Sequence, residues 1–110
     1  FFLEKNVIGF PTAVTKDQNS YCLFNILVKN RKKLIKLLNR DKIPYKIYYS
    51  KPLYKQYRII NNFKCQTTEQ ICKQIISLPF NYLSKSRLEL TITKLKKIIK
   101  SNRGLFFEKK

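Results

Sequence analysis

The stretch Tyr21–Val28 constrains the fold most, because it is apolar on both faces of an extended chain. Cys22, Phe24, Ile26 and Val28 alternate on one face, and Tyr21, Leu23 and Leu27 alternate on the other, interrupted only by Asn25. Such a pattern is typical of a strand in a sheet covered on both sides. Even about 300 Å² of exposed apolar surface costs roughly 7 kcal/mol. We therefore expect a neighbour to cover the second face.

Three helices are predicted from helical periods and capping residues. Asn30 is the N-cap of a helix to about Arg40. Its apolar stripe is Leu34, Ile35, Leu37 and Leu38, and its basic side is a solvated face. Thr67 and Gln70 form a capping box for a helix ending near Ser77. Its apolar face is Ile71, Cys72, Ile75 and Ile76. Ser84 caps a last helix to about Lys100, with Leu88, Ile92, Leu95 and Ile99 on one side.

Extended segments separate these helices. Pro44 opens a second strand over 45–49, residues 52–63 form a loop with one helical turn, and 78–80 make a short edge strand. The order β-α-β-loop-α-(β)-α predicts a small α/β sandwich whose helices cover one sheet face and leave the other for a partner. The domain boundaries are a lead-in segment at 1–19, a folded domain at 20–100 and a basic tail at 101–110.

Length and composition fit one domain, since the chain has 110 residues of which 44% are hydrophobic. No apolar run reaches the roughly 18 residues of a membrane span, and the start lacks a secretory signal. We therefore expect a cytoplasmic location and no membrane partner. The start within an apolar phrase, without an initiator Met, fits a domain cut from a longer chain or a trimmed chain.

The residue inventory excludes several chemistries. The chain has no His, which excludes His-based acid–base catalysis, Ser-His triads and His-ligated metals. Cys22, Cys65 and Cys72 lack the spacing of a structural zinc site and are interpreted as reduced thiols. No Gly-rich phosphate loop or pair of carboxylates is present, so the sequence indicates no self-contained active site.

The charge admits an alternative function. The net charge of +18 comes from 24 basic and six acidic residues, which favours a polyanionic partner. A basic nucleic-acid-binding or protein-interaction module, with Tyr and Phe among the cations, would explain it. However, the basic residues are spread from Lys5 to Lys110, and a specific nucleic-acid partner is not expected. A purely structural subunit of a complex also remains open.

An ordered series of phrases resembles a known family. The phrases are Ser20–Ile26, Lys29–Leu34, Ile43–Gln56, Glu69 and Ile76–Pro79. They resemble, in order and spacing, the C-terminal domain of the DegT/DnrJ/StrS sugar aminotransferases, over roughly 20–99. In that family the phrases are an aromatic strand, an Asn-Arg helix start, a Tyr-Tyr-Pro segment with Pro-Leu-His-x-Gln, and Leu-Ser-Leu-Pro. This sequence departs from the family pattern at three positions. Lys42 stands where Gly is common, Ser50 where Pro is usual, and Tyr54 where Pro-Leu-His-x-Gln has its His.

The resemblance implies a part of an enzyme that transfers an amino group to a keto-sugar nucleotide. Pyridoxal phosphate would be held by a large domain that this chain lacks, so we expect no cofactor on this chain alone and no catalytic residue in it. The complete enzyme is expected to be a homodimer. The resemblance also implies that Tyr48, Tyr49, Tyr54 and Gln56 border the substrate. Alternatively, the tyrosines pack between domains. We expect Tyr49 and Tyr54 to be substantially exposed in the isolated chain.

Overall fold

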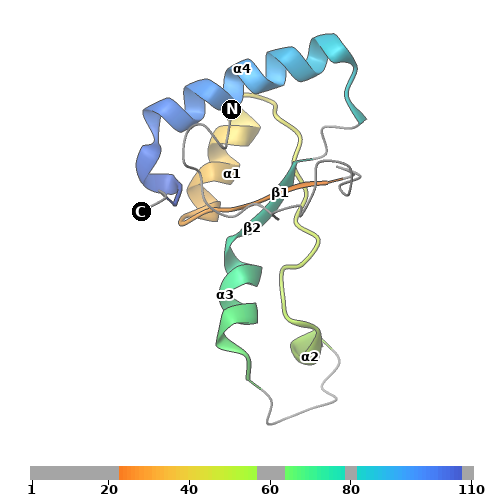
Figure 1. Cartoon of the computed structure of the whole chain (residues 1–110), viewed down its shortest axis with the longest axis vertical. Helices are drawn as coiled ribbons and strands as arrows, with labels where there is room; N and C mark the ends of the chain where they lie inside the picture. Colours follow the sequence, from red (N-terminus) through yellow and green to blue (C-terminus); the bar gives the residue numbers. More distant parts are fainter. Residues whose placement is uncertain (1–22, 57–63, 79–81, 108–110) are drawn as a thin grey trace, which may run out of the picture.

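The computed structural model describes residues 23–56, 64–78 and 82–107. Figure 1 shows the order of elements, which mixes helices with one small sheet as expected for an α/β chain. The elements are β1 (Phe24–Leu27), α1 (Arg31–Arg40), α2 (Leu53–Gln56), α3 (Gln66–Gln74), β2 (Ile75–Leu78), α4 (Lys85–Ser101) and the 3₁₀ helix η3 (Arg103–Leu105). Among the described residues, no helix combines the length and apolar character that a membrane crossing requires.

The described sheet is a two-stranded antiparallel pair. Ile26 of β1 lies opposite Ile76 of β2, and Phe24 lies opposite Leu78. The predicted first strand is confirmed for Phe24–Leu27, and its first two residues, 21 and 22, lie outside the described part. Val28 follows β1 and forms an isolated bridge with Phe106.

The core lies on one face of this sheet, beneath α1 and α4 (Figure 1). Among the described residues, the largest fully buried side chains are Ile26, Val28, Leu34, Leu38, Ile76, Leu78 and Ile98. The opposite face carries Leu23, Leu27 and Ile75, which are only half-buried. The predicted second covering of the sheet therefore stays a prediction.

The helix predicted from the capping box was placed wrongly. Helix α3 begins at Gln66 with Cys65 at the N-cap, so Thr67 lies inside the first turn. The helix ends at Gln74, and Ile75 and Ile76 belong to β2. Their apolar side chains fit a helical period, but pairing with Leu27 and Ile26 in the sheet overrides it. The observed strand β2 thus begins at Ile75, three residues before the edge strand predicted over 78–80. Residues 79 and 80 of that prediction lie outside the described part.

The predicted strand over 45–49 is also wrong, because this segment contributes only one isolated bridge. Lys46 and Ser77 exchange both backbone hydrogen bonds, at 2.8 and 2.9 Å. Pro44 has no N–H to extend the ladder in one direction. In the other direction both backbone groups of Ile75 are already used, since its N–H donates to Ile71 and its carbonyl accepts from Arg31.

The ends of α1 and α4 follow the sequence closely. The side chain of Asn30 accepts a hydrogen bond from the Lys33 N–H at 3.0 Å, as predicted. Ser84 is the N-cap of α4, although its side chain makes no capping hydrogen bond. Lys42 follows α1 with a φ of 55°, the left-handed region that glycine adopts most readily. This backbone geometry explains why glycine is common at that position in the family that the chain resembles.

Two segments differ from a simple layered arrangement. Leu105 and Phe106, in the stretch interpreted as a basic tail, are buried in the core. Helices α2 and α3 extend away from α1 and α4, on the far side of the sheet (Figure 1). We call residues 48–56 (its first leg) and 64–74 (its second leg) the arm, and the other described residues the body. The helical turn predicted after Pro52 is confirmed as α2, and residues 57–63 lie outside the described part.

Candidate functional site

The segment Tyr48–Gln56 leaves the sheet after the Lys46 bridge and becomes the first leg of the arm. Its first two aromatic side chains are largely in solvent, with 50% of Tyr48 and 61% of Tyr49 exposed. Leu53 is 69% exposed, while Pro52 between them is buried. Large apolar side chains grouped on one surface mark an interaction site more often than isolated ones do. The exposure of Tyr49 confirms the expectation for this residue.

Tyr54 and Gln56 are placed differently, because both bond within the arm. The Tyr54 hydroxyl donates to Oε1 of Glu69 at 2.8 Å and accepts the backbone N–H of Cys65 at 3.2 Å. Tyr54 is half-buried, which corrects the expectation of a substantially exposed side chain. The Gln56 amide donates to the carbonyl of Lys51 at 2.9 Å. These bonds hold the segment in shape, and the expectation that Tyr54 and Gln56 border the substrate stays a prediction.

Electrostatics reinforce this link between α2 and α3. Nζ of Lys55 lies 3.0 Å from Oε1 of Glu69, so one carboxylate joins two residues of α2 to α3. The Lys55 ammonium and the Tyr54 hydroxyl hold the pKa of Glu69 below its usual value. Burial, followed by the Glu69 contact, raises the pKa of the Tyr54 hydroxyl. Tyr54 thus stays protonated and able to donate near neutral pH.

Cys65 at the start of α3 also takes part in this region. Its Sγ accepts a hydrogen bond from the Thr68 hydroxyl at 3.0 Å, which lowers the pKa of the thiol. Cys72, seven residues further along α3, is buried, and both are free thiols as interpreted from their spacing, while Cys22 lies outside the described residues. In the described ranges, no group of three His, Cys, Asp or Glu side chains is arranged to hold a metal ion.

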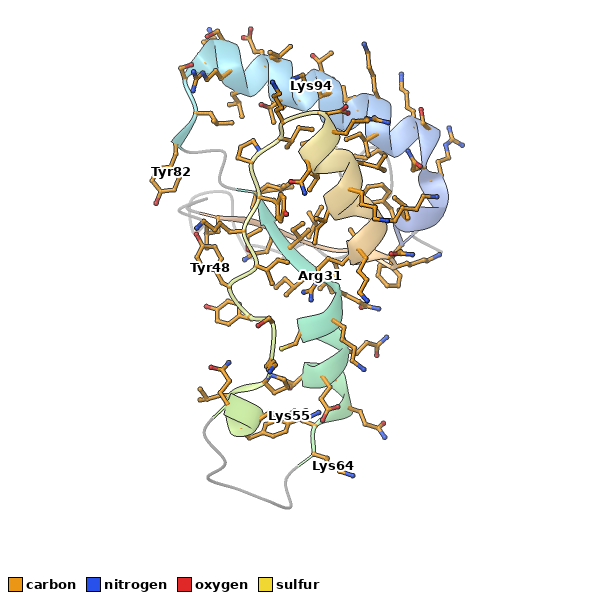
Figure 2. All side chains as sticks on the ribbon, turned by 180° about the vertical axis from the view of Figure 1, so that it is seen from behind. Arg31, Tyr48, Lys55, Lys64, Tyr82 and Lys94 are labelled. Atoms are coloured by element: carbon orange, nitrogen blue, oxygen red, sulfur yellow. The ribbon has the colours of Figure 1, made fainter. Side chains whose placement is uncertain are left out.

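Arg31 is the residue that sequence reasoning missed. It was assigned to a solvated basic face, but its Nη1 donates to the carbonyls of Cys72, at 2.7 Å, and Ile75, at 3.0 Å. Figure 2 shows Arg31 at the place where α3 meets β2. The only signal in the sequence was the Asn-Arg start of the helix, which does not reveal a contact more than 40 residues away.

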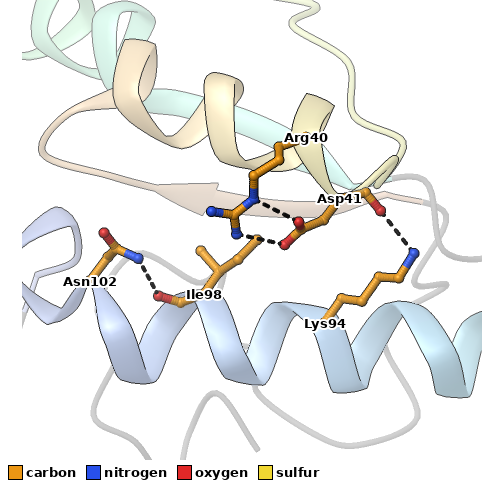
Figure 3. Close-up of polar contacts among 5 residues, drawn as sticks. All are labelled: Arg40, Asp41, Lys94, Ile98 and Asn102. Atoms are coloured by element: carbon orange, nitrogen blue, oxygen red, sulfur yellow. Dashed lines mark hydrogen bonds and ion pairs between the residues drawn. The ribbon is translucent and has the colours of Figure 1, made fainter.

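A second polar contact joins α1 to α4 on the side away from the arm (Figure 3). The Arg40 guanidinium bonds the Asp41 carboxylate at 2.8 and 3.1 Å, and Nζ of Lys94 donates to the Asp41 carbonyl at 2.9 Å. Arg40 holds the pKa of Asp41 below its usual value, with smaller contributions from Lys94 and Lys97. This contact fixes the end of α1 against α4.

Comparison with known proteins decides the family. A model of the DegT/DnrJ/EryC1/StrS aminotransferase family matches residues 3–96, which is most of the chain. The chain belongs to this family. The match includes the C-terminal-domain phrases from Ser20 to Pro79 and also extends into the segment interpreted as a lead-in. No curated protein matches the chain at a significant level.

Members of this family generally depend on pyridoxal phosphate, and the described residues do not fit a site for it. Such a site needs a lysine at the aldehyde carbon of the cofactor, an acid that faces the pyridine nitrogen at the opposite end of the ring, and hydrogen-bond donors for the phosphate. Of the three acids among the described residues, Glu69 is bound to Lys55 and Tyr54, Asp41 is bound to Arg40, and Glu89 is exposed on α4. No catalytic step is therefore assigned to the described residues.

Proposed function

We propose that this chain is the C-terminal part of a pyridoxal-phosphate-dependent enzyme that transfers an amino group to a keto-sugar nucleotide. The observation that carries the proposal is the family match over residues 3–96. A large domain would hold the cofactor, and the complete enzyme would act as a cytoplasmic homodimer in amino-sugar or polysaccharide biosynthesis. The chain alone would be incomplete.

The exposed aromatic residues suggest how this part would contribute. Tyr48 and Tyr49 project from the first leg of the arm and would border the substrate or the adjoining domain. Tyr54 and Gln56 would support them from within the arm, through Glu69 and the Lys51 carbonyl. The half-buried sheet face with Leu27 and Ile75 would pack against the large domain and complete the sandwich.

The first test uses the whole reading frame that contains this sequence. Its product is expected to bind pyridoxal phosphate and to aminate a keto-sugar nucleotide. Tyr49→Ala should lower kcat/KM about fivefold to tenfold, because an aromatic contact contributes about 1 kcal/mol beyond its area. Tyr82→Ala is the control, since Tyr82 is 79% exposed just before α4, away from the arm. An equal effect of both substitutions, or a product without transaminase activity, would overturn the proposal.

The second test uses the chain by itself. After mixing with pyridoxal phosphate and dialysis, we expect no absorbance of bound cofactor and no amino transfer. An ordinary exposed lysine stays protonated near neutral pH and reacts weakly and without selectivity. Stoichiometric cofactor that resists dialysis on a single lysine would show that a large domain is not needed.

A further inference from the structure

The junction between α3 and β2 has no turn to fix its direction. Gln74 ends the helix and Ile75 begins the strand. The Gln74 carbonyl accepts from the Val28 N–H at 3.1 Å, so by alternation the Ile75 carbonyl faces away from β1. The Cys72 carbonyl is among the last four of the helix, which have no partner within it. Two acceptors are therefore left where the arm leaves the sheet.

Arg31 supplies the donor for both acceptors. Its Nη1 bonds Cys72 and Ile75 at once, and its positive charge lies at the negative end of the α3 dipole. Arg31 itself is held firmly, because it is the first residue of α1, next to the Asn30 cap. Leu34 and Leu38 of the same helix are buried in the core. The guanidinium thus joins the arm to a helix that is anchored in the core.

Glu69 links the two legs of the arm. It bonds Tyr54 and Lys55, so α2 is attached to α3 over a sequence distance of about 15 residues. Just before the first leg, the Lys46–Ser77 bridge ties the chain to β2. The direction of α3 therefore determines where α2 lies.

We infer that Arg31 is a positioning residue: by bonding the Cys72 and Ile75 carbonyls it fixes the angle at which α3 leaves β2, and through Glu69 the place of α2. This inference needs only the geometry of the described residues. Its consequence for the substrate, through the Tyr48–Gln56 segment, rests on the proposed function.

Residual dipolar couplings of the backbone amides test the inference on the full 110-residue chain. In the wild type, one alignment tensor should fit α1, α3 and α4 together. In Arg31→Met, which keeps the apolar stem, the α3 couplings should no longer fit the tensor of α1 and α4 and should fall about twofold. The Glu69 amide should also lose protection from exchange about tenfold or more, because bonds to a charged donor are among the stronger ones.

Lys36→Met is the matched control, because it removes one charge from the exposed side of the same helix. It should leave the common tensor unchanged, and Arg31→Lys should restore part of it. If Arg31→Met does not fold, the fit of the α3 couplings to the tensor of α1 and α4 is compared between Arg31→Lys and the wild type. A general loss of stability would lower protection in α1 and α4 equally, without a separate tensor for α3. That result, or separate tensors in the wild type, would overturn the inference.

Discussion

At the scale of single residues, two cations of the chain bond backbone carbonyls where carboxylates are scarce. With 24 basic and six acidic residues, most lysines and arginines cannot find a carboxylate. Arg31 and Lys94 instead donate to backbone carbonyls at the ends of α3 and α1. A cation at a helix C-terminus is stabilised by the helix dipole as well as by the hydrogen bond. These two contacts connect parts of the chain that lie more than 40 residues apart.

The two paired carboxylates predict a pH dependence of stability. The pKa of Asp41 is lowered mainly by Arg40, and that of Glu69 mainly by Lys55. A lowered folded-state pKa stabilises the fold above the unfolded pKa of about 4 and loses that contribution as the pH falls through the folded value. The free energy of unfolding should therefore fall below about pH 4, and less steeply in the double variant Asp41→Asn/Glu69→Gln.

Urea titrations from neutral to acid pH measure this effect. Glu89→Gln is the control, since Glu89 is exposed on α4 and takes part in neither of the ion pairs found among the described residues. Its acid slope should match that of the wild type. If the double variant kept the full wild-type slope, the two ion pairs would contribute nothing to acid sensitivity.

At the scale of elements, the sequence predicts best where local signals and the final packing agree. Helix α1 has an Asn cap, a clear apolar stripe and a charged outer side, and it was predicted to within a residue. The helix α4 was predicted equally well from its period. Caps and apolar stripes lie within the helix itself, so no distant contact is needed to recognise them.

The elements that sequence reasoning misplaced depend on distant partners. Ile75 and Ile76 satisfy a helical period and are β-branched, so only their pairing with Leu27 and Ile26 decides for a strand. The segment at 45–49 has the sequence pattern of a strand. However, the N–H and the carbonyl of Ile75, which would pair with it, already bond Ile71 and Arg31. The half-burial of Tyr54 could not be predicted for the same reason, since its partner Glu69 lies 15 residues away.

The link within the arm predicts a local effect of Tyr54→Phe. Helix α2 has only four residues, too few to be stable alone. Loss of the hydroxyl removes the bond to Glu69 and the acceptor for the Cys65 N–H. The Lys55 amide, which bonds the Pro52 carbonyl, should then exchange several-fold faster. Amides of the core helix α1 should be unaffected.

Site-resolved hydrogen exchange measures this difference. Tyr49→Phe removes the same atom from an exposed side chain and should change no amide in the arm. Equal exchange of the Lys55 amide in Tyr54→Phe and in the wild type would mean that Lys55 and Glu69 alone hold α2.

At the scale of the whole molecule, the distribution of charge argues against a dedicated polyanion site. Exposed cations lie on the outer side of α1, along α4 and on the arm. They include Lys32, Lys36, Lys51, Lys64, Lys73, Lys96, Lys97 and Lys100. Sequence-selective readout needs base contacts held in a defined geometry, while scattered cations provide only attraction to phosphates. The family membership accounts for the ordered phrases without any nucleic-acid partner.

This distribution predicts how the chain binds nucleic acids. Association should be detectable at low salt and should be lost between about 50 and 200 mM salt, because it depends on the release of condensed counterions. RNA and DNA of different sequence and strandedness should compete equally, within about threefold, since the attraction is to phosphates and not to bases. Fluorescence anisotropy with unlabelled competitors measures both quantities.

Tyr49→Ala tests base stacking, the one contact that the exposed aromatic side chains could add. A preferred nucleic acid that stays bound at about 150 mM salt and is released by Tyr49→Ala would place the binding of nucleic acid above amino transfer as the function of this chain.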